Sequence, residues 1–238
     1  MLDVKNFSYR YGMNAPVLQN ISLHIADGER LALLGLSGRG KSTLALLLAG
    51  YLPLQEGSIA LDGAALPKGG YNPIQLIYQH PEKAMDPRWK VKDSLREAWD
   101  VPDELLRAIG AEPDWLTRWP NELSGGQRQA LTLLMATLVK PNLLLLDEHT
   151  AALDPKTAAK VLELTQQIVA EDQLTTLMIT HNMKDALRYG NRLIMLHEGR
   201  ILFDVPQEKK EGLTTRDLLS MFEQAAGSEL ASDSLLLS

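Results

Sequence analysis

The segment GLSGRGKS, from Gly35 to Ser42, fits the pattern G-x-x-x-x-G-K-[ST] and decides how the rest of the chain is interpreted. A continuous apolar run, Leu31 to Leu34, comes directly before it, and a leucine-rich stretch from Lys41 to Ala49 follows. The apolar run is typical of a strand covered on both faces of a parallel sheet, and the leucine-rich stretch is typical of a buried helix. Strand, glycine loop and helix in this order are the context in which the pattern binds phosphate.

The glycines of this loop allow successive backbone N–H groups to face the β- and γ-phosphates of a nucleotide, at the positive end of the following helix. Lys41 adds a positive charge, and the hydroxyl of Ser42 can be a ligand of Mg²⁺. A glycine-rich connection without a ligand is the alternative, but the flanking strand and helix favour phosphate binding. The residues predicted to contact the nucleotide here are Gly35, Ser37, Gly38, Gly40, Lys41, Ser42 and Thr43.

A second apolar run, Leu143 to Leu146, ends in the two acids Asp147 and Glu148. A buried strand that delivers carboxylates at its C-terminal edge places them where ligands of open α/β sheets bind. We predict that Asp147 holds Mg²⁺ through water and that Glu148 polarises an attacking water as a general base. Because an apolar strand that ends in two acids is also common at protein surfaces, this prediction depends on the phosphate loop.

The segment Leu123 to Gln127 reads LSGGQ, and Ser124 precedes a helical stretch that continues to Val139. A Ser-Gly-Gly turn that opens a helix is a second anion site of the same physical kind as the phosphate loop. An ordinary N-cap with flexible glycines is the alternative interpretation. One chain needs only one site for a γ-phosphate, so a second set of nucleotide contacts requires an explanation. The predicted contacts are Ser124, Gly125, Gly126 and Gln127.

The composition is that of an ordinary globular protein. The 238 residues are 45% hydrophobic and 23% charged, and at roughly 100 to 200 residues per domain they leave no room for two full catalytic domains. The net charge of -6 gives no long-range attraction to nucleic acid or to an anionic membrane, so we expect no nucleic-acid partner. The chain has no Cys, which excludes disulfides, thiolate zinc sites, iron–sulfur clusters and a Cys nucleophile.

No segment has the pattern of a targeting signal or a membrane span. Residues 1–5 lack a basic region followed by an apolar one, so no signal peptide is visible. The longest apolar runs, at 44–49 and 143–146, are far below the ~20 residues that cross a bilayer. We therefore expect a soluble cytoplasmic protein.

Turn residues divide the chain into segments of different character. Alternating apolar residues at 2–7 and 17–25 predict half-buried strands near the N-terminus. Residues 81–121 contain five Pro and all four Trp, together with helical stretches, and favour a helical insertion. The predicted organisation is a nucleotide-binding core with a β subdomain over 1–80, a helical subdomain over 81–123, the Ser-Gly-Gly helix and the rest of the core over 124–226, and a flexible tail over 227–238.

In this order the motifs resemble those of the ATP-binding cassette (ABC) ATPases, and the resemblance extends from about Leu2 to Phe203. It implies an α/β fold with a RecA-like core of the P-loop NTPase type, an antiparallel β subdomain and an inserted helical subdomain. It also implies ATP and Mg²⁺ as cofactors and ATP hydrolysis as the activity, with Glu148 as its base.

The resemblance gives further residues a role. Tyr11 matches the aromatic residue that stacks on adenine, although Tyr9 is a near competitor. Gln79, which follows a predicted strand, matches the glutamine that senses Mg²⁺ and the γ-phosphate and faces the helical insertion. His181, directly after the predicted strand 175–180, matches the switch histidine that contacts the γ-phosphate and helps to hold the attacking water.

Residues 151–154 match the loop that crosses to the partner subunit in this family, and Asp154 is also the predicted N-cap of a helix over 155–170. His149 stands where most family members carry Pro directly after the catalytic Glu. This difference leaves both carboxylates in place but could change the stiffness of the turn. The histidines interpreted as surface or structural residues, because they lack ligand spacing, are His24, His80, His149 and His197.

In this family the Ser-Gly-Gly-Gln turn of one subunit closes over ATP held by the phosphate loop of another, which accounts for the two anion sites. The resemblance therefore implies a second ABC ATPase subunit, in a homodimer or a heterodimer. It also implies an integral membrane permease, contacted by the helical insertion, and indirectly an extracytoplasmic solute-binding protein. The location it implies is cytoplasmic, peripheral on the inner face of the cell membrane.

Two parts of the chain resemble different importers. Residues 78–88 resemble dipeptide, oligopeptide and nickel import ATPases, whereas residues 129–157 look more like the ATPases of aromatic amino-acid-type importers. A recombined chain joined near 124–129 would explain the difference. We expect an importer of peptide, nickel or amino-acid-like solutes, because exporters commonly fuse membrane spans to the cassette. The alternative is a soluble ABC ATPase acting on DNA, ribosomes or cluster assembly, for which the sequence offers no basic surface, tandem cassette or long coiled coil.

Overall fold

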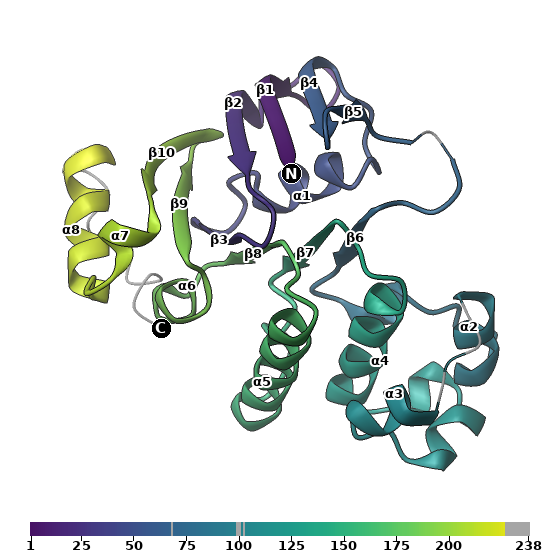
Figure 1. The fold of residues 1–238 in the computed structure, drawn as a ribbon. Coiled ribbons are helices and arrows are strands. Elements are labelled where there is room, and N and C mark those ends of the chain that lie inside the picture. Colours follow the sequence, from purple (N-terminus) through teal and green to yellow (C-terminus); the bar gives the residue numbers. More distant parts are fainter. Residues whose placement is uncertain (68, 99–100, 102, 227–238) are drawn as a thin grey trace.

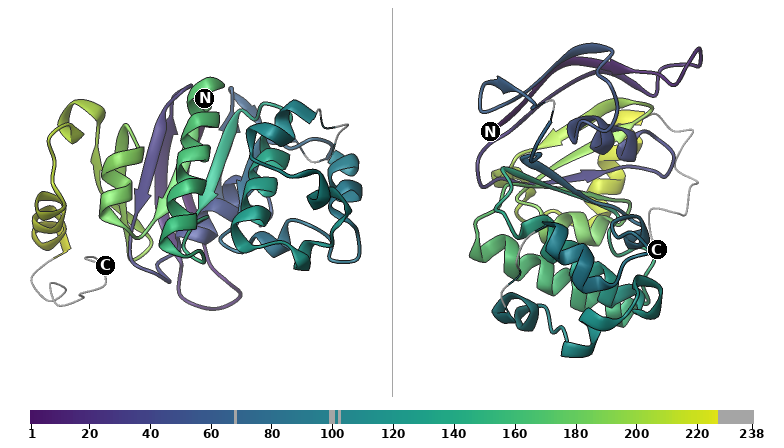
Figure 2. Two further views of the ribbon diagram at one scale, coloured as in Figure 1. Left: turned by 90° about the horizontal axis from the view of Figure 1, so that it is seen from below. Right: turned by 90° about the vertical axis from the view of Figure 1, so that its right-hand side faces the viewer.

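The computed structural model describes residues 1–67, 69–98, 101 and 103–226, which form two sheets with helices around them (Figure 1). A six-stranded sheet lies at the centre, and a four-stranded sheet lies over one of its faces (Figure 2). This is the predicted α/β architecture. Within the described residues, no helix combines the length and the apolarity that crossing a bilayer requires.

The large sheet is mainly parallel. Its strands are β3 (Arg30–Leu34), β6 (Ile74–Ile77), β7 (Leu143–Asp147), β8 (Thr176–Thr180), β9 (Arg192–His197) and β10 (Arg200–Val205). They follow the order β10-β9-β3-β8-β7-β6, and every neighbouring pair except β10 with β9 is parallel. Leu31 to Leu34 are fully buried, as expected for an apolar run that is covered on both faces of a parallel sheet.

This strand order brings the C-terminal ends of β3, β8 and β7 together at one edge of the sheet. Leu34 at the end of β3 pairs with Thr180 at the end of β8, and Ile179 pairs with Asp147 at the end of β7. The phosphate loop leaves β3, the two predicted acids end or follow β7, and His181 follows β8. Three site segments that are distant in sequence therefore begin side by side.

The small sheet is antiparallel and lies against the phosphate-loop helix. It consists of β1 (Leu2–Tyr9), β2 (Leu18–Ile25), β4 (Glu56–Leu61) and β5 (Ala64–Ala65), in the order β2-β1-β4-β5. The buried residues of β1 and β2 share one hydrophobic core with helix α1 (Lys41–Leu48) and with one face of the large sheet. Helix α1 consequently lies between the two sheets (Figure 1).

The other face of the large sheet is covered by α5 (Pro155–Glu171) and α6 (Met183–Tyr189), on the far side from the small sheet (Figure 2). Helix α4 (Gly125–Thr137) packs in the same core as α5. Helices α7 (Gln207–Lys210) and α8 (Thr215–Ala226) follow β10, and α8 packs in one core with α6, β3 and β9.

A helical region precedes α4 and lies beside the large sheet (Figure 1). It contains α2 (Val91–Ala98) and α3 (Asp103–Ala108), with 3-10 helices at Pro81–Lys83, Pro113–Thr117 and Pro120–Glu122. Its buried residues form a hydrophobic core of their own, to which α4 contributes. The predicted helical character of this segment is therefore confirmed.

The tryptophans of the helical region divide between core and surface. Trp115 is only 6% exposed and lies in the local core, whereas Trp89 and Trp119 are 39% and 40% exposed. Trp99 lies outside the described residues. The tryptophans of this region therefore contribute both to its small core and to its exposed surface.

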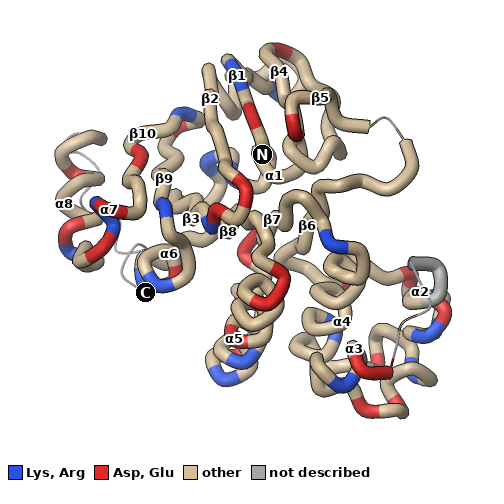
Figure 3. The backbone as a smooth tube through the Cα atoms, in the orientation of Figure 1, with Lys and Arg blue, Asp and Glu red and all other residues tan. Residues whose placement is uncertain are grey.

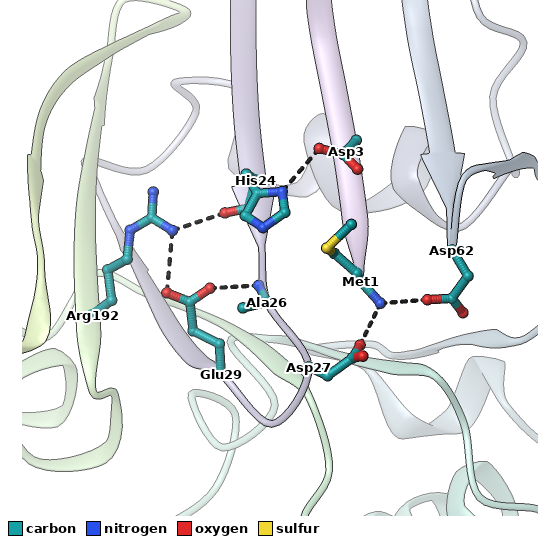
Figure 4. Close-up of polar contacts among 8 residues, drawn as sticks. All are labelled: Met1, Asp3, His24, Ala26, Asp27, Glu29, Asp62 and Arg192. Atoms are coloured by element: carbon teal, nitrogen blue, oxygen red, sulfur yellow. Dashed lines mark hydrogen bonds and ion pairs between the residues drawn. The ribbon is translucent and has the colours of Figure 1, made fainter.

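Arg192, at the start of β9, connects the two sheets (Figure 4). Its Nη1 donates to the backbone oxygen of His24 at 2.8 Å and to Oε1 of Glu29 at 3.1 Å. The other side of the guanidinium donates to both carboxylate oxygens of Asp204 at 2.8 and 2.5 Å. Glu29 also accepts the N–H of Ala26 at 2.8 Å. The turn from β2 to β3 is therefore held against β9 and β10.

A second polar cluster lies at the same junction (Figure 4). The amino group of Met1 contacts the carboxylates of Asp27 and Asp62. The hydrogen bond from this amino group holds the pKa of Asp62 below its usual range. Asp3 and the ring of His24 pair across β1 and β2 at 2.8 Å. The contact of Met1 with Asp27 fastens the start of β1 to the turn that enters the large sheet.

The strands and helices predicted from sequence are present, with ends that differ by no more than a residue or two. Asp154 caps α5 as predicted, and Ser124 caps α4, as in the alternative interpretation of the Ser-Gly-Gly turn. The elements without a predicted counterpart include α2, β5, α7 and α8. The predicted tail at 227–238 lies outside the described residues.

Candidate functional site

The phosphate loop connects β3 to α1, and its glycines are required by its backbone. Gly40 caps α1 with a φ of 97°, a left-handed conformation that side chains disfavour. A Cβ on Gly40 would also lie 3.0 Å from the backbone oxygen of Val17. At Gly35 a Cβ would lie 2.5 Å from the backbone oxygen of Leu196. The loop is therefore packed closely against Val17 and Leu196, and this packing leaves no space for a side chain at Gly40 or Gly35.

Lys41 is the first residue of α1, and its side chain is folded back over the loop. It is 4% exposed, and its Nζ donates to the backbone oxygens of Gly35 at 2.8 Å and Leu36 at 3.0 Å. The same ammonium group forms an ion pair with Oε1 of Glu148 at 3.2 Å. Lys41 therefore places its charge at the mouth of the loop, in contact with the predicted base.

Glu148 joins the three site segments. Its Oε1 faces Lys41 at 3.2 Å, and its Oε2 lies 3.1 Å from Nδ1 of His181. Its own N–H donates to the backbone oxygen of Ile179 at 3.0 Å, and its φ of 45° is left-handed. The sequence predicted Glu148, Lys41 and His181 separately, and the structure brings them into direct contact.

Asp147 is the last residue of β7 and is buried beneath the phosphate loop. It is 7% exposed, and this burial raises the pKa of its carboxyl, against the opposing effect of the Ser42 hydroxyl. Among the described residues, no group hydrogen-bonds to its buried Oδ1. A buried carboxylate oxygen without a donor is suited to a cation or its water ligand. The predicted metal residues Asp147 and Ser42 are thus adjacent.

A depression of about 370 Å³ opens in front of the phosphate loop. The Tyr11 hydroxyl lies 3.3 Å from Oγ1 of Thr43 at its rim. Tyr9 is 6% exposed and belongs to the core, so of the two candidate tyrosines only Tyr11 faces the depression. The residues that line it are Tyr11, Val17, Ser37, Gly38, Gly40, Lys41, Ser42, Thr43, Gln79 and Glu148.

The Ser-Gly-Gly-Gln turn does not line this depression. Ser124 caps α4 by accepting the N–H of Gln127 at 3.2 Å, and the Gln127 side chain accepts the N–H of Ser124 at 2.8 Å. Gly126 packs so closely on α5 that a Cβ would lie 2.3 Å from Cγ2 of Thr157. Asp154 caps α5, and its hydrogen bond from Thr157 lowers its pKa. Neither Asp154 nor the turn meets the phosphate loop within one chain.

The sequence analysis gave His149 no role beyond a surface or structural one, and the structure shows it to be buried. It is 3% exposed, its Nε2 lies 3.2 Å from Oγ1 of Thr165, and burial lowers its pKa to about 4. Val17, which lines the depression, was also missed, because a half-buried apolar residue directly before a strand has no local pattern of a ligand contact. The position of Val17 follows from the packing of β2 on the loop.

Comparison with known proteins agrees with this geometry. The ABC transporter family matches residues 18–151, more than half of the chain. The tyrosine transport ATP-binding protein of Clostridioides difficile (strain R20291) is 40% identical over 250 residues, covering 94% of this chain and 100% of that protein. The nickel import system ATP-binding protein NikE of Staphylococcus aureus (strain MSSA476) is 32% identical over 223 residues, covering 88% of this chain and 92% of that protein.

Solved structures show the same fold. The dimeric structure of a post-hydrolysis state of the ATP-binding cassette MJ0796, bound to ADP and Pi, has a TM-score of 0.73 and 25% sequence identity. The match covers 87% of this chain and 99% of the chain in that structure. The predicted P-loop NTPase fold and the predicted ATPase activity are confirmed. The chain, with its phosphate loop, strand-end carboxylates and neighbouring histidine, belongs to the ABC transporter family as an ATP-binding subunit that hydrolyses ATP.

Proposed function

We propose that this ATPase drives an importer of peptide, nickel or amino-acid-like solutes. The relative at 40% identity is a tyrosine transport protein that aligns with 94% of the chain, and it favours an amino-acid-like solute among the three. The contact of Glu148 with both Lys41 and His181, beside the depression, is the observation that carries the proposed mechanism.

The nucleotide occupies the depression in front of the phosphate loop. Tyr11 stacks on the adenine, and the N–H groups of residues 35–43 surround the phosphates. Lys41 exchanges the carboxylate of Glu148 for a γ-phosphate oxygen, which is a stronger charge partner because the triphosphate carries several negative charges.

The residues below the loop fit Mg²⁺. Ser42 offers a hydroxyl, Asp147 offers a buried carboxylate oxygen, and Gln79 lines the same depression. Oxygen ligands of this kind suit Mg²⁺, which keeps several waters and phosphate oxygens in its shell. When bound, the ion supplies charge that neutralises the phosphate oxygens during transfer.

Glu148 accepts a proton from the water that attacks the γ-phosphorus, and ADP leaves as the opposite bond breaks. His181 is held by the same carboxylate at 3.1 Å, which positions its ring to contact the γ-phosphate and the water. A base must lie within hydrogen-bond reach of the proton it removes, and Glu148 reaches the mouth of the depression from the end of β7.

The second set of nucleotide contacts belongs to a partner subunit. Ser124, Gly125, Gly126 and Gln127 lie outside the depression, so one chain alone leaves the nucleotide open on that side. A partner's turn and its Asp154 loop close over the γ-phosphate in a homodimer or heterodimer. Hydrolysis replaces one bridging ligand by two products and reopens the pair, which makes the dimer a nucleotide-driven clamp.

The helical region supplies the contact to a membrane permease. Trp89 and Trp119 are partly exposed there, and amphipathic aromatic side chains are common in protein interfaces. Lys and Arg lie interspersed with Asp and Glu over the described part of the chain, which does not favour a nucleic-acid partner (Figure 3). The protein then acts from the cytoplasmic face of the membrane, where a solute-binding protein reaches it only through the permease.

The variant Glu148→Gln tests the proposed chemistry. It keeps a hydrogen-bonding side chain but removes the base, so kcat should fall by about 10²- to 10⁴-fold while ATP still binds. The closed dimer should accumulate with Mg²⁺ and ATP in size-exclusion chromatography with light scattering. Glu208→Gln removes an exposed acid on α7 and should leave turnover unchanged.

Wild-type turnover in Glu148→Gln would show that another group is the base. The transport assignment is tested separately by purification from membranes and identification of the proteins that come with the chain. A permease and a solute-binding protein are expected. Recovery with ribosomes or DNA would instead support the alternative of a soluble ABC ATPase.

A further inference from the structure

His149 directly follows the predicted base, and its ring is attached to α5. Its Nε2 lies 3.2 Å from Oγ1 of Thr165, and the Thr165 hydroxyl donates its only proton to the backbone oxygen of Val161 at 2.8 Å. Since that hydroxyl can then only accept from the ring, the direction of the bond is fixed. The neutral ring of His149 donates its Nε2–H to Thr165.

Glu148, the residue before His149, has a backbone conformation that its surroundings must stabilise. Glu148 has a φ of 45°, a left-handed conformation that residues with a side chain rarely adopt. Such a conformation persists where its surroundings impose it. The N–H of Glu148 bonds to Ile179 on β8, and its oxygen accepts the N–H of Ala151 in the following turn, so neither backbone bond reaches α5. The His149 ring is the side chain that ties this turn to α5.

The turn also lines a pocket that is partly open to solvent. A cavity of about 350 Å³ lies between α5 and α6 and is lined in part by Glu148, His149 and His181. A loop next to a cavity of this size has room to shift inward unless a contact prevents it. Such a shift would change the position of Glu148 relative to Lys41, which now lies 3.2 Å away.

We propose that His149 is a positioning residue for ATP hydrolysis, whose hydrogen bond to Thr165 holds Glu148 in its left-handed conformation between Lys41 and His181. His149 touches neither nucleotide nor water in this role. It acts through the backbone of the neighbouring base. The inference rests on the proposed role of Glu148 as general base.

Four variants test the bond. His149→Met removes the donor and keeps an apolar side chain of similar volume, and Thr165→Val removes the acceptor with little change of shape. His149→Gln restores an N–H donor at about the same reach. Thr132→Val is the matched control, because Thr132 is also buried in a helix and also donates to the backbone oxygen four residues earlier.

We expect kcat to fall by about 10- to 100-fold in His149→Met and in Thr165→Val, because small displacements of a catalytic group have effects of this size. The KM for ATP should remain unchanged, and the double variant should be no slower than either single one. His149→Gln should regain most of the lost kcat, and Thr132→Val should behave as wild type. Thermal melting of each variant verifies that it is folded.

Unchanged kcat in both Thr165→Val and His149→Met would overturn the proposal. Losses that multiply in the double variant would show that the two side chains do not act through one bond. An increase in KM without a change in kcat would indicate a merely structural role. If Glu148→Gln is inactive while the His149 variants keep the wild-type kcat, only this inference fails. If Glu148→Gln keeps the wild-type turnover, Glu148 is not the general base, and the proposed mechanism fails as well.

Discussion

Replacing Arg192 by Met should destabilise the protein more than its place near the surface suggests. The guanidinium is 19% exposed, and it donates to the backbone oxygen of His24 and to Glu29, whose side chain is 16% exposed. Each such charge-assisted hydrogen bond contributes about 1.5 kcal/mol at the lower end of its range. Asp204 is 43% exposed, so its pair with Arg192 adds only about 0.5 kcal/mol because water screens it.

The expected loss is therefore about 3.5 kcal/mol in the free energy of unfolding. For a chain of this length, that loss corresponds to a decrease in Tm of roughly 7–14 °C. Urea unfolding followed by circular dichroism measures the first quantity, and a thermal scan measures the second. Met retains much of the buried stem of Arg, so the difference reports mainly on the lost hydrogen bonds.

The control is Arg200→Met on β10. Arg200 also carries a guanidinium and also donates to a side chain, Gln19, at 2.8 Å, but this contact is exposed. The change there should be within about 0.5 kcal/mol of zero. If the Arg192 and Arg200 variants lose the same small amount, the bonds at Arg192 do not hold the small sheet on the large one, and the reasoning is refuted.

Three further outcomes follow from the structure. Gly40→Ala should bind nucleotide more weakly and melt at a lower temperature, since a Cβ at φ 97° costs roughly 1–2 kcal/mol; unchanged affinity in a nucleotide titration would contradict this. Trp115→Ala should lower stability by about 3–5 kcal/mol in urea unfolding, while the exposed Trp89→Ala should change it little. In EDTA, the free energy of unfolding should fall as the pH decreases from 6.5 to about 4. Burial lowers the pKa of His149 in the folded chain, so the unfolded chain binds the proton first. The loss reaches about 3 kcal/mol and should be missing in His149→Gln.

Local patterns were sufficient for the elements that carry the site. The run Leu31 to Leu34 predicted a strand covered on both faces, and the structure buries all four residues. Asp154 was predicted as a cap and an N-cap was the alternative interpretation of Ser124, because side chains of these types accept N–H groups at helix starts, as both do here. These features depend on neighbours only a few positions away in the sequence.

Other features depend on contacts between distant segments and could not be predicted locally. Tyr9 and Tyr11 were both candidates for the adenine contact because they lie only two positions apart. Tyr9 ends β1 and is buried in the core, whereas Tyr11 lies beyond the strand and is exposed. The ion pair of Lys41 with Glu148 requires β8 to lie between β3 and β7, an order that no local pattern specifies. Helix α8 is different, since buried Leu218 and Phe222 at a spacing of four are a helical signal that the sequence analysis did not use.

In the proposed mechanism, the ion pair of Lys41 and Glu148 couples nucleotide binding to hydrolysis. A ligand that draws the ammonium group onto its own terminal phosphate also frees one oxygen of the carboxylate. A shorter or less charged molecule that leaves Lys41 where it is keeps that oxygen occupied. The movement of Lys41 that binds the terminal phosphate therefore also frees Glu148 to accept a proton. Hydrolysis of an incorrectly bound ligand is disfavoured, because Glu148 then stays paired with Lys41.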